Sequence, residues 1–237
     1  MKEIYPRVHK FIAARLTPGE ELGLHFTVGI ALMLLAAWVF GGIAEEVVEA
    51  QEITILDEWL AHWFNVRATP AFTQAMMYLS HAHNTAGMLI MTTVVGMYFY
   101  LRKAPYWLLA LVVSVPGGML LNVILKQVFQ RARPSLENPL LTLTTYSFPS
   151  GHTVAATLFY GLIAAYLVCL ASRWKSRFLI VLGACAMVGL VGLSRMYLGV
   201  HYLSDVLAAI AEGCGWLAIC ITGVSTLRRR RAARATA

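Results

Sequence analysis

Apolar residues run along this chain in long, nearly uninterrupted stretches that are separated by short polar segments. A helix needs about 20 mainly apolar residues to cross a bilayer. Six stretches approach that length: Leu24–Ala44, Thr85–Leu101, Ala104–Leu125, Thr153–Ala171, Phe178–Leu193 and Leu203–Val224. The second is short and can begin earlier, near Phe72. The pattern predicts an all-α fold, an integral membrane bundle of six transmembrane helices in a single domain, residues 1–237.

The first stretch has one feature of a secretory signal peptide, because Gly42-Ile43-Ala44 imitates a small-residue cleavage site. Its apolar run is longer than the roughly 7–15 residues of a signal-peptide core. We therefore expect a retained helix.

Composition supports the membrane prediction. Of the 237 residues, 59% are hydrophobic and 13% are charged, whereas soluble domains carry roughly 25% charged residues. An ordinary soluble domain is therefore excluded. The cysteines form no C-x-x-C pair and lie in predicted spans, so we expect free packing thiols, not metal or disulfide sites, at Cys169, Cys185, Cys214 and Cys220.

The net charge of +7 is compatible with nucleic-acid binding, but the cations are grouped by position. They occupy residues 1–23, the connections after the second and fourth predicted helices, and residues 225–237. By the positive-inside rule, these segments and both termini are cytoplasmic. We interpret the run Arg228–Arg231 as an anchor to anionic lipid, in preference to a nucleic-acid site.

Residues 45–84 are acidic where they follow the first predicted helix, so we expect an external loop. Its acids are Glu45, Glu46, Glu49, Glu52, Asp57 and Glu58. The segment ILDEWLAHWF predicts a short amphipathic helix with Leu56, Trp59, Leu60 and Trp63 on one face. That face either lies in the headgroup region or packs on the other helices, and the pattern favours neither.

Some cations break this charge pattern, because they fall on the predicted external side: Lys126, Arg131, Arg133 and Arg195. Ionisable groups at membrane depth are costly and usually functional. Lys126 ends the third predicted helix and Arg133 precedes Pro134, so a helix exit and a stiff turn can bring both toward one point. The alternative is a lysine that merely extends to the interface.

The motif FPSGHT, residues 148–153, stands directly before the fourth apolar run. Ser150 suits an N-cap, Gly151 allows close approach of the backbone to a ligand, and the free N–H groups of a helix start attract anions. Phosphate is the expected guest. The alternative is an ordinary helix start with His152 as an interfacial histidine.

His201 and Asp205 are four residues apart at the start of the last predicted helix, so they share a face. The carboxylate can accept the Nδ1–H of the imidazole and leave Nε2 free as a nucleophile. Arg195 offers a two-pronged donor for phosphate. Three helix ends therefore deliver histidines, a carboxylate and cations to one side of the membrane between residues 126 and 205.

These residues resemble the three-part signature of the type-2 phosphatidic-acid phosphatase family, which shares its pocket with vanadium haloperoxidases and glucose-6-phosphatase. The matching pieces are K-x6-R-P (Lys126, Arg133, Pro134), P-S-G-H (149–152) and S-R-x5-H-x3-D (Ser194, Arg195, His201, Asp205). LDEWLAHWF and SRMYLGVHYLSDVLA also look like the bacterial six-helix branch of this family.

The resemblance implies a catalytic role for each matched residue. His201 would attack phosphorus and carry a phosphohistidine, Asp205 would orient it, and His152 would protonate the departing oxygen. The implied phosphate-binding residues are Lys126, Arg133, Ser150, Gly151 and Arg195. No metal and no cofactor is implied, since cations and a helix end supply the charge that phosphoryl transfer needs.

Three polar residues lie outside the signature. Glu212 follows Asp205 by two helical turns, and two alternatives remain open for it: a hydrogen bond within the bundle or a tuning of the pocket. His81 and His83 are spaced like metal ligands on a strand. No carboxylate or cysteine accompanies them, so we favour an interfacial role above the pocket.

The predicted function is hydrolysis of a lipid phosphomonoester or diphosphate at the outer face of a bacterial inner membrane. Undecaprenyl diphosphate ranks first, ahead of phosphatidic acid and phosphatidylglycerol phosphate, because an outward site suits recycling of a lipid carrier. Alternatives are a lipid phosphotransferase and a non-catalytic phospholipid-binding protein, whereas a haloperoxidase is disfavoured because that chemistry belongs to soluble relatives. The expected partners are the lipid substrate and the bilayer, and the oligomeric state is open.

Overall fold

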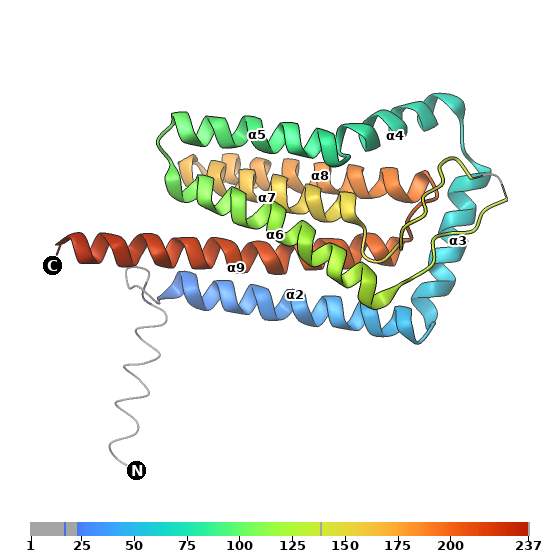
Figure 1. Ribbon diagram of the computed structural model, residues 1–237, viewed down its shortest axis with the longest axis horizontal. Helices are drawn as coiled ribbons and strands as arrows, with labels where there is room; N and C mark the ends of the chain where they lie inside the picture. Colours follow the sequence, from blue (N-terminus) through green and yellow to red (C-terminus); the bar gives the residue numbers. More distant parts are fainter. Residues whose placement is uncertain (1–16, 18–22, 138, 237) are drawn as a thin grey trace, which may run out of the picture.

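The structure is a computed structural model that describes residues 17, 23–137 and 139–236. Within these residues every regular element is an α-helix (Figure 1), and their bounds are α2 Leu24–Val48, α3 Glu52–Val66, α4 Pro70–Ala82, α5 Thr85–Leu101, α6 Pro105–Phe129, α7 Gly151–Leu170, α8 Trp174–Tyr197 and α9 Leu203–Thr236. The predicted N-terminal segment 1–23 lies outside the described residues, apart from Thr17 and Gly23.

The predicted helical membrane bundle is confirmed. Five described helices, α2, α6, α7, α8 and α9, are each long and apolar enough to cross a bilayer. The short helices α4 and α5 pass the same test together, bent by 54° at the break between them, and complete the set of six spans. Large apolar side chains point outward along the bundle, among them Trp38, Leu34, Leu89 and Trp174. Such an apolar surface suits lipid.

Four helices end several residues later than predicted, and the first is α2, which ends at Val48 and not at Ala44. α6 continues to Phe129, so Lys126 lies within its last turn and does not end the helix. α8 continues to Tyr197 and includes Arg195. α9 continues to Thr236, so the predicted basic tail is helical through that residue. Lysine and arginine are good helix formers, and a helix does not need to end where its apolar run ends.

The acidic segment after α2 forms two helices, α3 and α4. α3 crosses one end of the bundle, where the 130–150 connection also lies (Figure 1). Asp57 and Ala61 of α3 are buried against the protein, whereas Trp59 and Leu56 are exposed. The packed face of α3 is therefore not the apolar face of the sequence pattern, and Trp59 remains available to a headgroup layer.

Close helix crossings hold α9 in the bundle, where it contacts α2, α6 and α7. A Cβ atom at Gly29 of α2 would fall 1.9 Å from Thr222 Oγ1 of α9, and one at Gly213 would fall 2.7 Å from Thr157 of α7. Small residues allow such approaches between membrane helices. The crossings bring the start of α9, which carries Asp205, beside the start of α7.

Candidate active site

One cavity of about 460 Å³ lies where the end of α6, the start of α7 and the α8–α9 turn meet. All three regions of the predicted signature contribute to its lining, through Lys126, Arg133, Gly151, His152, Arg195 and His201. Its other polar lining residues are Asn122, Thr145, His83, Thr85 and Thr92. The two imidazoles of the signature, His152 and His201, therefore face the same cavity. Ser150 and Asp205 are fully buried behind it.

His201 sits in the turn between α8 and α9. Gly199 adopts a φ of 70°, a left-handed conformation that glycine tolerates. The Nδ1 of His201 lies 3.2 Å from Asp205 Oδ2, and the same oxygen accepts the N–H of Tyr202 at 3.0 Å. Because a carboxylate can only accept, Nδ1 carries the proton and Nε2 presents its lone pair.

Burial keeps this imidazole neutral. His201 is 3% exposed, and burial lowers its pKa to about 3 although the adjacent Asp205 carboxylate acts to raise it. A neutral imidazole is the form that can act as a nucleophile.

Arg133 links the segment after α6 to the same turn. Its guanidinium donates to the carbonyl of Thr145 at 2.6 Å and to that of Val200 at 2.6 Å. Its Nη1 also lies 3.3 Å from His201 Nε2, so it reaches the lone pair of the imidazole. Burial lowers the pKa of Arg133, and Asp205 counters that effect. A phosphate group placed at His201 Nε2 would therefore lie beside the positively charged guanidinium of Arg133.

Lys126 and Arg195 approach the cavity from two other helices. Lys126 Nζ donates to the carbonyls of Tyr146 and Ser147 at 2.8 and 3.0 Å. The ammonium group has three protons, which leaves one for a ligand. Arg195 is 2% exposed and donates from Nη1 to Ser80 Oγ of α4, while its Nε has no partner among the described residues.

The start of α7 differs in one detail from the prediction. Ser150 occupies the N-cap position, but its side chain makes no capping bond and instead accepts the hydroxyl of Thr153 at 3.0 Å. Its backbone N–H donates to the carbonyl of Asp205 at 3.1 Å. A Cβ atom at Gly151 would fall 3.2 Å from Asn122 Oδ1, so the residue is small where the backbone approaches α6.

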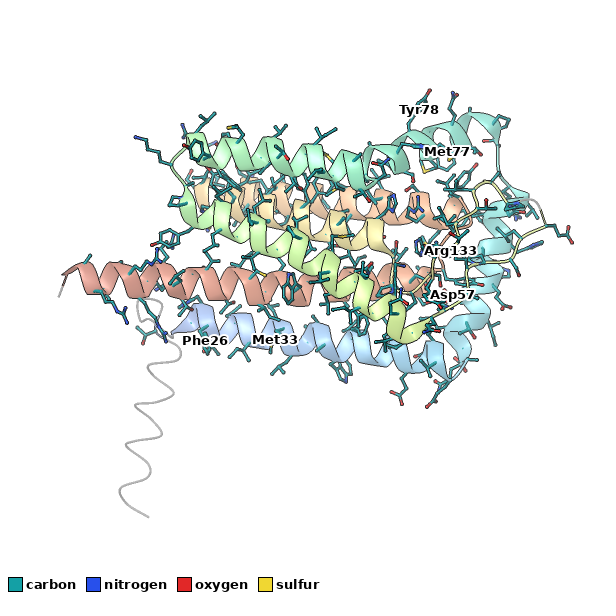
Figure 2. The ribbon with its side chains drawn as sticks, viewed as in Figure 1. Phe26, Met33, Asp57, Met77, Tyr78 and Arg133 are labelled. Carbon is teal, nitrogen blue, oxygen red and sulfur yellow. The ribbon has the colours of Figure 1, made fainter. Side chains whose placement is uncertain are left out.

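Two residues that the sequence interpretation left without a role form a network behind His201. Arg131 donates to Asp205 Oδ1 at 2.7 Å and to Asp57 Oδ2 at 2.8 Å, and its guanidinium lies 4.3 Å from the ring centre of Tyr202. Burial acts to lower the pKa of Arg131, but the two carboxylates outweigh it and the pKa is raised. Figure 2 shows Asp57 and Arg133 at the same end of the bundle.

Of the three polar residues outside the signature, Glu212 lies within the bundle, and His81 and His83 lie at the end of α4. Glu212 is buried and accepts a hydrogen bond from Asn122 Nδ2 at 3.1 Å, which is the first of the two alternatives given for it. His83 is buried at the cavity, with Nδ1 2.9 Å from the carbonyl of Leu79 and Nε2 2.8 Å from the hydroxyl of Tyr160. His81 is exposed in the last turn of α4. These histidines lie at a helix end and not on a strand, so the spacing typical of metal ligands on a strand does not apply to them, and their interfacial role stays a prediction.

The arrangement defines a class of protein. A neutral imidazole held by a carboxylate, a second imidazole and three cations share a cavity inside a membrane bundle. Such a set can hold a tetrahedral anion and transfer its phosphoryl group.

The comparisons with known proteins agree. The sequence pattern of the PAP2 superfamily matches residues 107–229. Phosphatidylglycerophosphatase B of Bacillus subtilis is 32% identical over 175 residues, which cover 72% of this chain and 78% of that protein. The lipid A 1-phosphatase of Rhizobium etli is 33% identical over 112 residues, 44% of this chain and 43% of that protein.

Solved structures show the same fold. The crystal structure of a transmembrane PAP2-type phosphatidylglycerolphosphate phosphatase from Bacillus subtilis has a TM-score of 0.67 and 30% identity, and covers 82% of this chain and 94% of its own. Aquifex aeolicus LpxE has a TM-score of 0.55 and 20% identity, with coverage of 69% and 94%. The chain belongs to the PAP2 superfamily, and it is a membrane lipid phosphatase.

Proposed function

We propose that this protein hydrolyses a lipid phosphate through a phosphohistidine on His201. In the first step the lone pair of Nε2 attacks phosphorus, and the bond from phosphorus to the lipid oxygen breaks. His152 gives that oxygen a proton, so the lipid leaves as an alcohol. The observation that supports this order is the bond between His201 Nδ1 and Asp205, which leaves Nε2 unprotonated beside Arg133.

In the second step a water molecule attacks the phosphohistidine. His152, now neutral, takes a proton from the water, the bond between phosphorus and Nε2 breaks, and inorganic phosphate leaves. Lys126, Arg133 and Arg195 hold the phosphate oxygens in both steps, since these cations line the cavity with the two histidines. Stabilising charge at the transferring group is the main demand of this chemistry.

The shape of the cavity favours a lipid substrate. Its polar part lies at the histidines, and its apolar part is formed by α5 and α6 through Met88, Leu89, Val115, Met119 and Val123. An amphiphile would place its phosphate among the cations and its tail between these two helices. The substrate would therefore enter sideways from the lipid layer that surrounds α5 and α6.

We favour a phosphomonoester over a diphosphate, which reverses the ranking from the sequence. The cationic side chains that line the described cavity are Lys126, Arg133 and Arg195. Three cations suit the oxygens of one phosphoryl group and leave none for a second. The similarity to phosphatidylglycerophosphatase B of Bacillus subtilis supports phosphatidylglycerol phosphate as the first candidate.

We further propose that the site faces the exterior of the bacterial inner membrane and both termini face the cytoplasm. The α5–α6 and α7–α8 connections and the C-terminal end of α9 lie at the end of the bundle opposite to α3 (Figure 1). Those connections carry Arg102, Lys103 and Arg173, and the first turn of α8 adds Lys175 and Arg177. The positive-inside rule assigns such an end to the cytoplasm.

A phosphate-release panel in detergent micelles tests this function. The substrates are phosphatidylglycerol phosphate, phosphatidic acid, undecaprenyl diphosphate and a water-soluble phosphomonoester. We expect the highest kcat/KM with phosphatidylglycerol phosphate and one free phosphate per lipid alcohol. A higher value with undecaprenyl diphosphate would restore the original ranking. A phosphorylated alcohol in place of free phosphate would identify a phosphotransferase, and lipid binding without turnover a binding protein.

A further inference from the structure

Asp57 differs from the other acids of residues 45–84. It is 1% exposed, whereas Glu45, Glu49, Glu52 and Glu58 are exposed. An unpaired buried carboxylate would cost several kcal/mol, so its partners are informative. They lie far away in the sequence, beyond α8 and in the segment after α6.

Both oxygens of Asp57 are occupied. Oδ1 accepts the backbone N–H of Ser204 at 2.9 Å, and Oδ2 accepts the Ser204 hydroxyl and Nη2 of Arg131, the latter at 2.8 Å. Ser204 immediately precedes Asp205, and Nη1 of Arg131 donates to the Ser204 hydroxyl at 2.6 Å. α3 is thereby joined to the start of α9 at the catalytic carboxylate.

Arg131 divides its charge between two carboxylates. Nη2 meets Asp57 and Nη1 meets Asp205 Oδ1, at 2.8 and 2.7 Å. The other oxygen of Asp205 holds His201. The three side chains Asp57, Arg131 and Asp205 carry one net negative charge beside His201. Without Asp57, the arginine would neutralise Asp205 alone, and that net charge would be zero.

We propose that Asp57 and Arg131 are positioning residues for the phosphoryl transfer: Arg131 fixes the orientation of Asp205, and Asp57 preserves the negative charge that faces His201. This inference rests on the proposed phosphohistidine mechanism. When Nε2 bonds to phosphorus while Nδ1 keeps its proton, the imidazole becomes positively charged. The retained negative charge stabilises that state, and it acts on the rate of transfer more than on binding of the lipid.

The test compares charge variants by steady-state kinetics and rapid-quench measurement of phosphoenzyme, with short-chain phosphatidic acid in detergent micelles. For Asp57→Asn we expect kcat to fall about tenfold or more and KM to change less than about threefold. In Arg131→Gln, kcat should fall further than in Asp57→Asn, because this variant leaves the buried carboxylates of Asp57 and Asp205 without a cation between them. The double variant restores one net negative charge, so its kcat should exceed that of Arg131→Gln by about tenfold.

Glu52→Gln is the matched control, because it removes one exposed charge from the same helix, and its kcat should be unchanged. Arg131→Lys keeps the charge without the forked geometry and should be faster than Arg131→Gln. Thermal unfolding identifies the folded variants. A purely structural role predicts a double variant no faster than Arg131→Gln, and that result would overturn the proposal, as would an unchanged kcat in Asp57→Asn.

If Asp57→Asn does not fold, the proposal is tested by comparing the turnover of Arg131→Lys with that of Arg131→Gln. Faster turnover in Arg131→Lys supports the proposal, and equal turnover overturns it. Failure of the underlying mechanism is recognised separately. A wild-type enzyme that hydrolyses lipid without phosphohistidine overturns both proposals, whereas phosphohistidine in the wild type without recovery in the double variant overturns only this one.

Discussion

The two ends of the bundle carry the same kinds of cation in different surroundings. At the end with the α5–α6 and α7–α8 connections, Lys103, Arg173 and Lys175 are exposed to solvent. At the other end, Arg195 is 2% exposed and the side chain of Arg131 is 13% exposed. Exposed charges contribute little to stability, and we propose that these set the orientation of the protein in the membrane, whereas buried charges must be balanced by partners or by a ligand. The position of a cation therefore predicts its use.

The largest difference in the effect of a substitution on kcat/KM is expected between Arg195 and Lys175. Arg195→Ala should lower kcat/KM by about 10²–10³-fold, the usual loss when one oxyanion donor is removed. Lys175→Ala should leave kcat/KM unchanged, because Lys175 is exposed at the opposite end. The measurement is phosphate release in micelles with both variants checked by thermal unfolding. Equal losses would remove the distinction between the two ends.

The buried imidazole of His201 should make the stability of the protein depend on pH. Burial lowers the pKa of His201 to about 3 while Asp205 opposes this change and Lys126 and Arg133 reinforce it, and an unperturbed histidine has a pKa near 6.5. As pH falls below about 6.5, the unfolded chain binds a proton that folded His201 refuses, so stability present above that pH is lost on acidification. Between about pH 6.5 and 5 the loss is about 2 kcal/mol.

This loss should appear as a lower unfolding temperature in micelles, by roughly 2–4 °C for each kcal/mol. The control is His201→Gln, which lacks the titrating group and should lose less stability over the same range. If this variant and the wild type lose stability equally, His201 is not the group that refuses the proton.

A smaller effect is expected at Gly151. In Gly151→Ala the added methyl group would lie 3.2 Å from Asn122 Oδ1 and displace a residue that also contacts Glu212. We expect kcat/KM to fall about tenfold, because small displacements of reacting groups are costly. Gly183→Ala is the matched control, since nothing lies within 4 Å of its Cβ position. If kcat/KM is unchanged in Gly151→Ala, the start of α7 accommodates the added methyl group, and the close approach to Asn122 does not matter for activity.

The smallest effect is expected at Glu212. Its bond to Asn122 can be kept by an amide oxygen, so Glu212→Gln should change kcat by less than about threefold. A loss beyond tenfold, measured by the same phosphate assay with normal thermal unfolding, would mean that the carboxyl group itself takes part in the site.

Much of this architecture follows from the sequence. Long apolar runs predicted the helices, and Thr85–Leu101 has the same bounds in the structure. The motif positions were readable because each stands at or near a helix end. The helix ends at Lys126 and Arg195 were misjudged, since polar residues can continue a helix after its apolar run ends.

The residues that support the site from behind could not be predicted from the spacing of residues in the sequence. Asp57 belongs to an acidic run that resembles an external loop, and only the crossing of α3 over the bundle brings it to Arg131. Asn122 gave a weak signal, as a polar residue within an apolar span. Ser80 gave none, because its contact with Arg195 depends on the packing of α4 against α8.

The most direct test of the central claim is chemical trapping of the intermediate. Purified enzyme is mixed with phosphorus-labelled lipid phosphate, quenched within a turnover and digested, and the labelled peptide is sequenced. We predict an acid-labile, base-stable label on His201 that forms and decays at rates consistent with turnover and is missing from His201→Gln. An active enzyme that carries its label on another residue, or turns over without any labelled protein, would contradict this prediction.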